Sequence, residues 1–177
     1  MSITGLKKTK PPVEKKYEIL EIDEMYWFVF HRPRTATREN VYLIIMVSRN
    51  PRQIVGFDIA YDKTPERIQR MVDAAPPSTK YYTDGYLGYV DVVYPGSHIR
   101  NIHNKNDTHT VESVNADLRH YIPILARRSR CFARTIDTLF AVVGVFVDAY
   151  NRFGLAKANF RNSLRLGDLP FSVLDFL

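Results

Sequence analysis

Cysteine is nearly absent from the 177-residue sequence, in which Cys131 is the one thiol. A single cysteine cannot close an internal disulfide, and it cannot build a cysteine-rich zinc site. Small scaffolds that are held together by disulfides are therefore excluded. This cysteine usage favours a reducing cytoplasm as the compartment.

Long apolar runs are missing as well. The longest, residues 139–147, is too short to cross a bilayer. The N-terminal stretch MSITGLKKTK lacks the apolar core of a signal peptide. The sequence also has no glycine-rich phosphate loop, and no serine or cysteine has a convincing base beside it. We therefore expect neither a membrane partner nor a covalent nucleophile.

Apolar and aromatic residues are plentiful, at 45% and 12% of the sequence. These fractions are typical of a folded protein, and the length suits one domain with one sizeable core. Residues 1–16 contain five lysines and two prolines, which indicates a flexible basic arm or linker. We assign residues 17–177 to a single folded domain.

Positive charge is in excess, with a formal net charge of +6. A basic balance favours an anionic partner such as nucleic acid. Between residues 100 and 134, seven Lys or Arg residues accompany three acidic ones, for a net charge of +4. This region is either a solvated helix surface or a strip that contacts phosphates.

The apolar periodicity and the turn residues predict three strands, a helix, two short strands and then two helices. The strands are expected over residues 17–30, 41–47, 53–61, 80–83 and 97–102, and the helices over 64–75, 108–120 and 133–150. Thr64 is a plausible N-cap, and Pro65 stands at the first helical position. This order of elements is that of an α/β ribonuclease-H-like fold, a mixed five-stranded sheet flanked by helices.

One acidic residue, Asp23, stands inside the first apolar strand. A carboxylate in a central strand is costly unless it is paired or binds a metal. Strand alternation places Glu21 on the same face as Asp23 and Glu24 on the opposite face. Glu21 and Glu24 are rival candidates that spacing does not exclude, and an edge strand with Asp23 in solvent is the plainer alternative.

Two more acidic residues follow later in the chain. Asp84 comes at the end of a short strand and precedes Gly85, a position from which a side chain can project into a cleft. The plainer interpretation is an ordinary Asp-Gly turn. Glu112 lies in the helix after the last strand, where it is either a functional group or a solvated glutamate. Carboxylates that converge from separate elements are the ligands that a pair of Mg²⁺ ions needs.

Four blocks of the sequence carry a resemblance to a known family. They are EIDEMYWFV (21–29), YTDGYLGY (82–89), KNDTHTVESVNADLR (105–119) and LARRSRCFARTIDTLFAVVGVFVDAYN (125–151). In this order they resemble the insertion-sequence-one family of DDE transposases, over roughly residues 17–151. The block from Lys105 is the most specific, whereas the segment from His98 to Lys105 is longer than the family pattern. That length leaves the roles of His98 and His103 open, and the role of His109 is open as well.

The resemblance implies a DNA transposase catalytic domain that cleaves and joins DNA strands during transposition. Asp23, Asp84 and Glu112 would hold two Mg²⁺ or Mn²⁺ ions, and Asn115 would contact DNA or orient Glu112. The expected phosphate contacts are Lys105, Arg119, Arg127 and Arg128. The implied partners are mobile-element ends and target DNA, in a homodimer or larger assembly associated with the bacterial nucleoid.

Residues 1–16 are too short and too rich in lysine and proline for a helix-turn-helix. We therefore expect the recognition of element ends to reside in a DNA-binding module encoded upstream. The alternative function is that of a non-catalytic DNA-binding or regulatory remnant of a degraded or frame-split element. A host nuclease of the same fold is a third possibility.

Overall fold

A computed structural model describes residues 17–31, 37–101, 107–127 and 131–153. Several sequence predictions lie outside these residues: the basic arm 1–16, the phosphate contacts Lys105 and Arg128, the open role of His103 and the packing of the C-terminal residues. Within the described residues, no helix is long and apolar enough to span a membrane.

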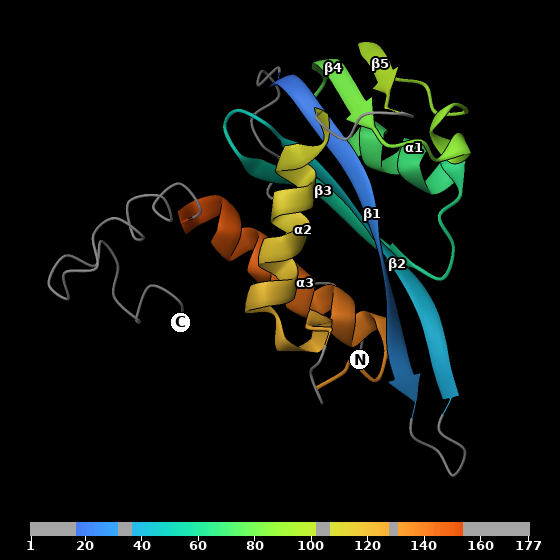
Figure 1. The fold of residues 1–177 in the computed structure, drawn as a ribbon, viewed down its shortest axis with the longest axis vertical. Helices are drawn as coiled ribbons and strands as arrows, with labels where there is room; N and C mark the ends of the chain where they lie inside the picture. The colour runs from blue at the N-terminus through green and yellow to red at the C-terminus, as the bar shows by residue number, and fades with distance from the viewer. Residues whose placement is uncertain (1–16, 32–36, 102–106, 128–130, 154–177) are drawn as a thin grey trace, which may run out of the picture.

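Five strands form one mixed sheet in the order β3-β2-β1-β4-β5 (Figure 1). Strands β1, β2 and β3 form the predicted antiparallel meander, while β4 pairs parallel to β1 and β5 pairs parallel to β4. Their bounds are Tyr17–His31, Thr37–Ser48, Gln53–Ala60, Ser78–Thr83 and Ser97–Arg100. The predicted ribonuclease-H-like topology is confirmed.

Three helices cover the sheet, α1 on one face and α2 and α3 on the other (Figure 1). The 3₁₀ turns η1 and η3 lie in two of the connections. The helices span Pro65–Ala74, His109–Tyr121 and Ile136–Phe153, and the turns span Leu87–Tyr89 and Pro123–Leu125. The third helix begins three residues later than predicted, because Thr135 accepts a hydrogen bond from the backbone of Thr138 and so opens the first turn there.

The first helix follows its sequence pattern closely. Ile68, Met71 and Val72 are its buried residues, and they form the face that the spacing of apolar residues predicts. Pro65 is the first helical residue as expected. Thr64 occupies the N-cap position, but its side chain makes no capping hydrogen bond, so the preformed backbone of Pro65 is the local signal that starts the helix.

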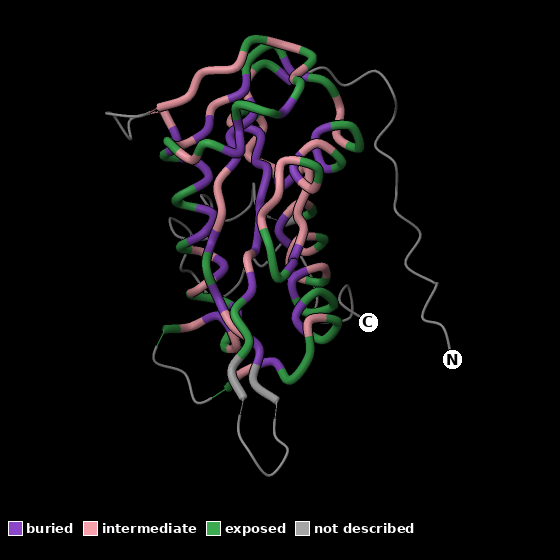
Figure 2. Tube along the Cα trace, turned by 90° about the vertical axis from the view of Figure 1, so that its right-hand side faces the viewer, coloured by how far each residue is buried: buried purple, intermediate pink, exposed green. Residues whose placement is uncertain are grey.

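The central strand, β1, separates two apolar clusters (Figure 2). Met25, Trp27 and Val29 pack with α2 and α3, whereas Leu20 and Ile22 pack with α1. Burial on both faces explains why this strand is so apolar. The carboxylates in the middle of β1, those of Glu21, Asp23 and Glu24, therefore lie close to a dry interior, and that position governs the chemistry of the site.

Candidate metal centre

The parallel pairing of β1 and β4 brings two of the predicted acidic residues together. The register matches Ile22 with Thr83, after which the pairing stops. Asp23 and Asp84 are the next residues on the two strands, so they lie at the same level of the sheet. Two carboxylates 61 positions apart in sequence thus share one site because of strand register alone.

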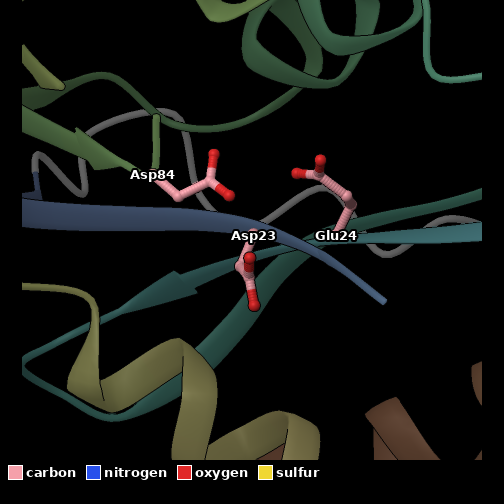
Figure 3. Close-up of side chains that lie close together, drawn as sticks. All are labelled: Asp23, Glu24 and Asp84. Atoms are coloured by element: carbon pink, nitrogen blue, oxygen red, sulfur yellow. The ribbon is translucent and has the colours of Figure 1, made fainter. Parts of the chain in front are cut away.

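Glu24 joins these two residues (Figure 3). Each of the three side chains has a carboxylate oxygen within 4.8 Å of the others. Asp84 and Glu24 extend toward one another on one side of β1, while the carboxylate of Asp23 lies on the other side. Alternation along β1 turns Asp23 toward α2 and Glu24 toward α1, and the group forms where β4 no longer covers the edge of β1.

The local electrostatics are dominated by excess negative charge. The pKa of Asp23 is raised from 3.8 to about 6, first by burial and then by the charges of Glu24, Asp84 and Glu112, against a lowering hydrogen bond from the backbone of Glu24. The Asn115 amide donates a 2.7 Å hydrogen bond to Asp23 Oδ2. A buried carboxylate that resists ionisation beside other carboxylates is the arrangement that a bound cation relieves.

Glu24 has protein partners of its own. The Lys63 ammonium forms an ion pair with Oε1, and the Tyr89 hydroxyl donates a 2.7 Å hydrogen bond to Oε2. Glu24 is therefore both a member of the acidic group and the anchor of a lysine. From the sequence, Glu24 is an alternative to Asp23 as the acidic ligand. In the structure both residues belong to the acidic group.

Glu21, the other alternative to Asp23, binds protein groups on both of its oxygens. Its side chain is completely buried, and its two oxygens accept hydrogen bonds from Arg49 Nε at 2.7 Å and from the backbone N–H of Val111 at 2.8 Å. Val111 lies in the first turn of α2, where backbone N–H groups lack helical partners. Glu21 thus caps α2 from the neighbouring strand, and both of its oxygens have protein donors.

Glu112, the predicted third ligand, lies in the first turn of α2 with its side chain exposed. It is not a member of the group within 4.8 Å. Its charge nevertheless contributes, as the smallest of the causes, to the raised pKa of Asp23. The structure therefore brings Asp23 and Asp84 together with Glu24, and it leaves Glu112 outside this group.

The predicted DNA-contacting residues divide into two kinds. Asn115 is only 4% exposed and binds Asp23, so the contact observed is with a carboxylate of the site. Arg119 is partly buried, and the pKa of its guanidinium is lowered by burial and by Arg127, against a raising effect of Asp23. Arg127 itself is exposed. Arg119 therefore feels the charge of Asp23 as well as that of Arg127.

His98, whose role the sequence left open, contacts the end of β4. Its Nε2 lies 2.9 Å from Thr83 Oγ1, and its ring stacks on Tyr94 with centroids 4.2 Å apart. Burial, followed by the charge of Arg100, lowers its pKa. A neutral imidazole in this place helps fix the strand that precedes Asp84. His109 is exposed at the first position of α2.

Sequence reasoning missed Lys63 and Tyr89. Neither stands in a pattern that points to chemistry, because their importance comes from reaching Glu24 across 39 and 65 positions of the chain. In the sequence, Tyr89 is one of several tyrosines near Asp84, and nothing distinguishes it there from a residue that only packs. Its complete burial beside a carboxylate is visible only in the fold.

The donor set fits a hard divalent cation. Mg²⁺ and Mn²⁺ prefer carboxylate oxygens, and two or three carboxylates from separate elements are what such ions need. The amide of Asn115, whose Oδ1 has no hydrogen-bond partner among the described residues, adds a further oxygen beside Asp23. A ribonuclease-H-like fold with an acidic group of this kind is compatible with nucleotidyl transfer or nuclease chemistry. Compared with protein-family models and with curated proteins, the chain matches none.

Proposed function

We propose that this chain is the catalytic domain of a DDE-type DNA transposase, which cleaves and joins DNA strands with the help of two divalent metal ions. The observation that carries the proposal is the parallel β1–β4 register, which sets Asp23 beside Asp84 at the open edge of the central strand. The sequence resemblance to the insertion-sequence-one family supports the same conclusion. It names Glu112, in the first turn of α2, as the third acid.

In the proposed reaction, a water oxygen attacks a phosphodiester at the end of the element, and the P–O3′ bond breaks to leave a free 3′-OH. That hydroxyl then attacks a phosphodiester of the target DNA in a second in-line step. When bound, the ions activate the attacking oxygen and neutralise charge on the leaving one. No covalent enzyme intermediate is required.

The residues of the chain hold and orient the parts of this reaction. Asp23, Asp84 and Glu112 hold the ions, and Asn115 fixes one oxygen of Asp23 by its 2.7 Å hydrogen bond. Arg119 and Arg127 hold phosphate oxygens, and the support for this role is that the charges of both Asp23 and Arg127 act on the Arg119 guanidinium. The proposed DNA assembly contains at least two copies of the chain, because paired ends require paired active sites.

The deciding experiment is Mn²⁺-dependent cleavage of DNA that carries the ends of the element. We expect Asp84→Asn to lower the cleavage rate by about 10²–10⁴-fold, because metal-assisted charge stabilisation is worth several kcal/mol. Asp91→Asn is the matched control, since Asp91 is exposed in the same connection and lies outside the acidic group. Equal cleavage by wild type and Asp84→Asn would sink the proposal.

The non-catalytic alternative makes a different prediction for the same samples. A regulatory remnant would bind DNA without cleaving it, with or without Mn²⁺, and Asp84→Asn would leave its binding unchanged. Fusion of the chain to the product of the upstream reading frame extends the test, because a frame-split enzyme regains cleavage in the fusion whereas a remnant does not.

A further inference from the structure

Lys63 stands beside the acidic group in a carefully fixed position. It lies between β3 and α1, and its ammonium forms an ion pair with Glu24. The ammonium lies 3.8 Å from the centroid of the Tyr86 ring and 5.5 Å from that of Tyr42. The Tyr86 hydroxyl in turn donates a 3.0 Å hydrogen bond to the backbone carbonyl of Lys63. An ion pair and two aromatic rings thus hold one cation.

The Lys63 ammonium lies against a carboxylate oxygen that a metal ion at this site could use as a ligand. Lys63 pairs with Oε1 of Glu24, while Tyr89 donates to Oε2. The ammonium therefore occupies one of the positions from which Oε1 could bind an ion, so an ion that uses Glu24 as a ligand beside Asp23 and Asp84 competes with Lys63 for its charge. The negative charge of the group belongs to three carboxylates, and Lys63 is the cation that the structure places in direct contact with one of them.

The Lys63 side chain is exposed and flexible enough for its ammonium to leave Glu24. It is about one-quarter exposed, so its ammonium lies near solvent and not in the core. Lysine carries a compact charge on a flexible four-carbon stem, and it binds phosphate as a point charge. Burial lowers the pKa of Lys63, but the Glu24 hydrogen bond and the charges of Glu24, Tyr86 and Asp84 raise it more strongly. The side chain is therefore charged at neutral pH.

We propose that Lys63 is an exchangeable counter-ion of the metal site: it neutralises Glu24 in the metal-free protein, yields Glu24 to a divalent ion, and then binds a phosphate oxygen of the DNA. The second half of this sequence rests on the proposed function, whereas the first half concerns metal binding alone. An ammonium and a divalent cation repel one another at the same carboxylate. Their exchange keeps the charge of the site compensated in both states.

The test measures Mn²⁺ binding to the DNA-free protein by titration calorimetry. We expect Lys63→Met to bind Mn²⁺ about tenfold more tightly than wild type, a change of about 1.4 kcal/mol. Lys63→Arg keeps the charge and is expected to stay near the wild-type affinity. Lys80→Met is the matched control, because Lys80 is exposed on β4 outside the acidic group. A variant that merely loosens the fold would bind Mn²⁺ more weakly, so the direction of the change separates the two effects.

Glu24→Gln supplies the second arm of the test. In that background Lys63→Met is expected to leave the Mn²⁺ affinity unchanged, because the oxygen for which lysine and metal compete has lost its charge. The exchange is overturned if the Lys63→Met single variant binds Mn²⁺ no more tightly than wild type. It is also overturned if Lys63→Met increases the Mn²⁺ affinity as much in the Glu24→Gln background as it does in wild type.

Cleavage of DNA then separates this inference from the proposed function. If wild type cleaves DNA, Lys63→Met is expected to raise KM for DNA despite its tighter Mn²⁺ binding, and Lys63→Arg to restore it. An unchanged KM overturns the phosphate contact. If wild type does not cleave DNA but Lys63→Met still gains Mn²⁺ affinity, the counter-ion role holds and the proposed function fails.

Discussion

At the scale of single residues, Asp23 shows how burial and charge shape the site. Its pKa is raised because burial and three neighbouring carboxylates, Glu24, Asp84 and Glu112, all disfavour its ionised form. The same conditions make Asp23 a receptive ligand for a divalent cation, which supplies the missing positive charge. The Asn115 amide holds one oxygen of this carboxylate through its hydrogen bond.

This raised pKa has a consequence for the stability of the metal-free protein. Between pH 4 and pH 6, the folded protein binds a proton at Asp23 that the unfolded chain has released, since the folded pKa is about 6 and the ordinary value is 3.8. The contribution of Asp23 to stability is therefore lost as pH rises through this window. Asp23→Asn is expected to be more stable than wild type at pH 7, by roughly 1–3 kcal/mol, and equal to it near pH 3. Urea unfolding without metal at both pH values measures this, and a wild type that is the more stable at pH 7 contradicts it.

The predicted triad is tested by isosteric neutralisation. Asp23→Asn, Asp84→Asn and Glu112→Gln are each expected to abolish strand transfer and to leave the fold intact, because each removes one negative ligand from the same pair of ions. Strand-transfer assays with circular dichroism as the fold control measure both outcomes. Near-normal transfer by any variant removes that residue from the triad, and for Glu112 the next candidate is Glu24.

At the scale of elements, α2 is held to the sheet by a polar clamp next to the site. Arg49, in the turn after β2, binds Glu21 and donates a 2.8 Å hydrogen bond to the carbonyl of Asp107. Arg52 in the same turn donates to Ser113 on α2 at 2.8 Å. The β2–β3 turn thus sets the position of the helix that carries Glu112 and Asn115.

The clamp predicts a non-additive pair of mutations. Arg49→Met leaves the Glu21 carboxylate buried without its charged partner, which is expected to cost roughly 3–5 kcal/mol in the free energy of unfolding. Adding Glu21→Gln removes the buried, unpaired negative charge and is expected to restore part of the lost free energy of unfolding. Urea unfolding of the two single variants and the double variant measures the coupling. A double variant as unstable as the sum of the singles would show that the two residues act independently.

The elements themselves were largely predictable, because alternating and 3.6-residue apolar patterns follow from which face is buried. Ile68, Met71 and Val72 on α1 illustrate this. The sequence also indicated Asp23, since an acid within an apolar strand is costly, whereas Asp84 was singled out mainly by the family resemblance because an Asp before a Gly is common in turns. The sequence did not show which of Glu21 and Glu24 belongs to the acidic group. Strand alternation assigns each residue to a face of β1, but it does not show that Arg49 pairs with Glu21 and Lys63 with Glu24. Those partners are long-range contacts that no local pattern encodes.

At the scale of the whole molecule, metal binding is expected to stabilise the fold, because an ion bound only by the native state shifts unfolding by mass action. At 100 times its dissociation constant, Mn²⁺ adds about 2.7 kcal/mol, which corresponds to a rise in Tm of several degrees in a domain of this size. Differential scanning fluorimetry measures the rise in wild type, and Asp84→Asn is expected to lose most of it. An identical rise in both proteins would mean that Mn²⁺ binds elsewhere.

The charge of the whole molecule also sets how it meets DNA. We expect this chain alone to bind DNA weakly, with a strong dependence on salt and little preference for element ends. The exposed positive groups near the site, such as Arg127, contact phosphates, and phosphate contacts carry little sequence information. Competition binding at fixed salt compares end DNA with scrambled DNA of equal length. A preference of about 10³-fold or more, as in specific binders, would place end recognition within these 177 residues.

The Asn115–Asp23 hydrogen bond joins residues 92 positions apart, and this distance matters during protein synthesis. Strands β1 and β4, the turn η1 and the segment that carries Lys63 all leave the ribosome before α2 does. The three carboxylates and their lysine are thus translated as one early unit, and the helix that brings Asn115 and Glu112 arrives last. A nascent or prematurely terminated product that ends before α2 carries the acidic group without the parts that complete it. The acidic residues are therefore synthesised before the helix that supplies the hydrogen bond to Asp23.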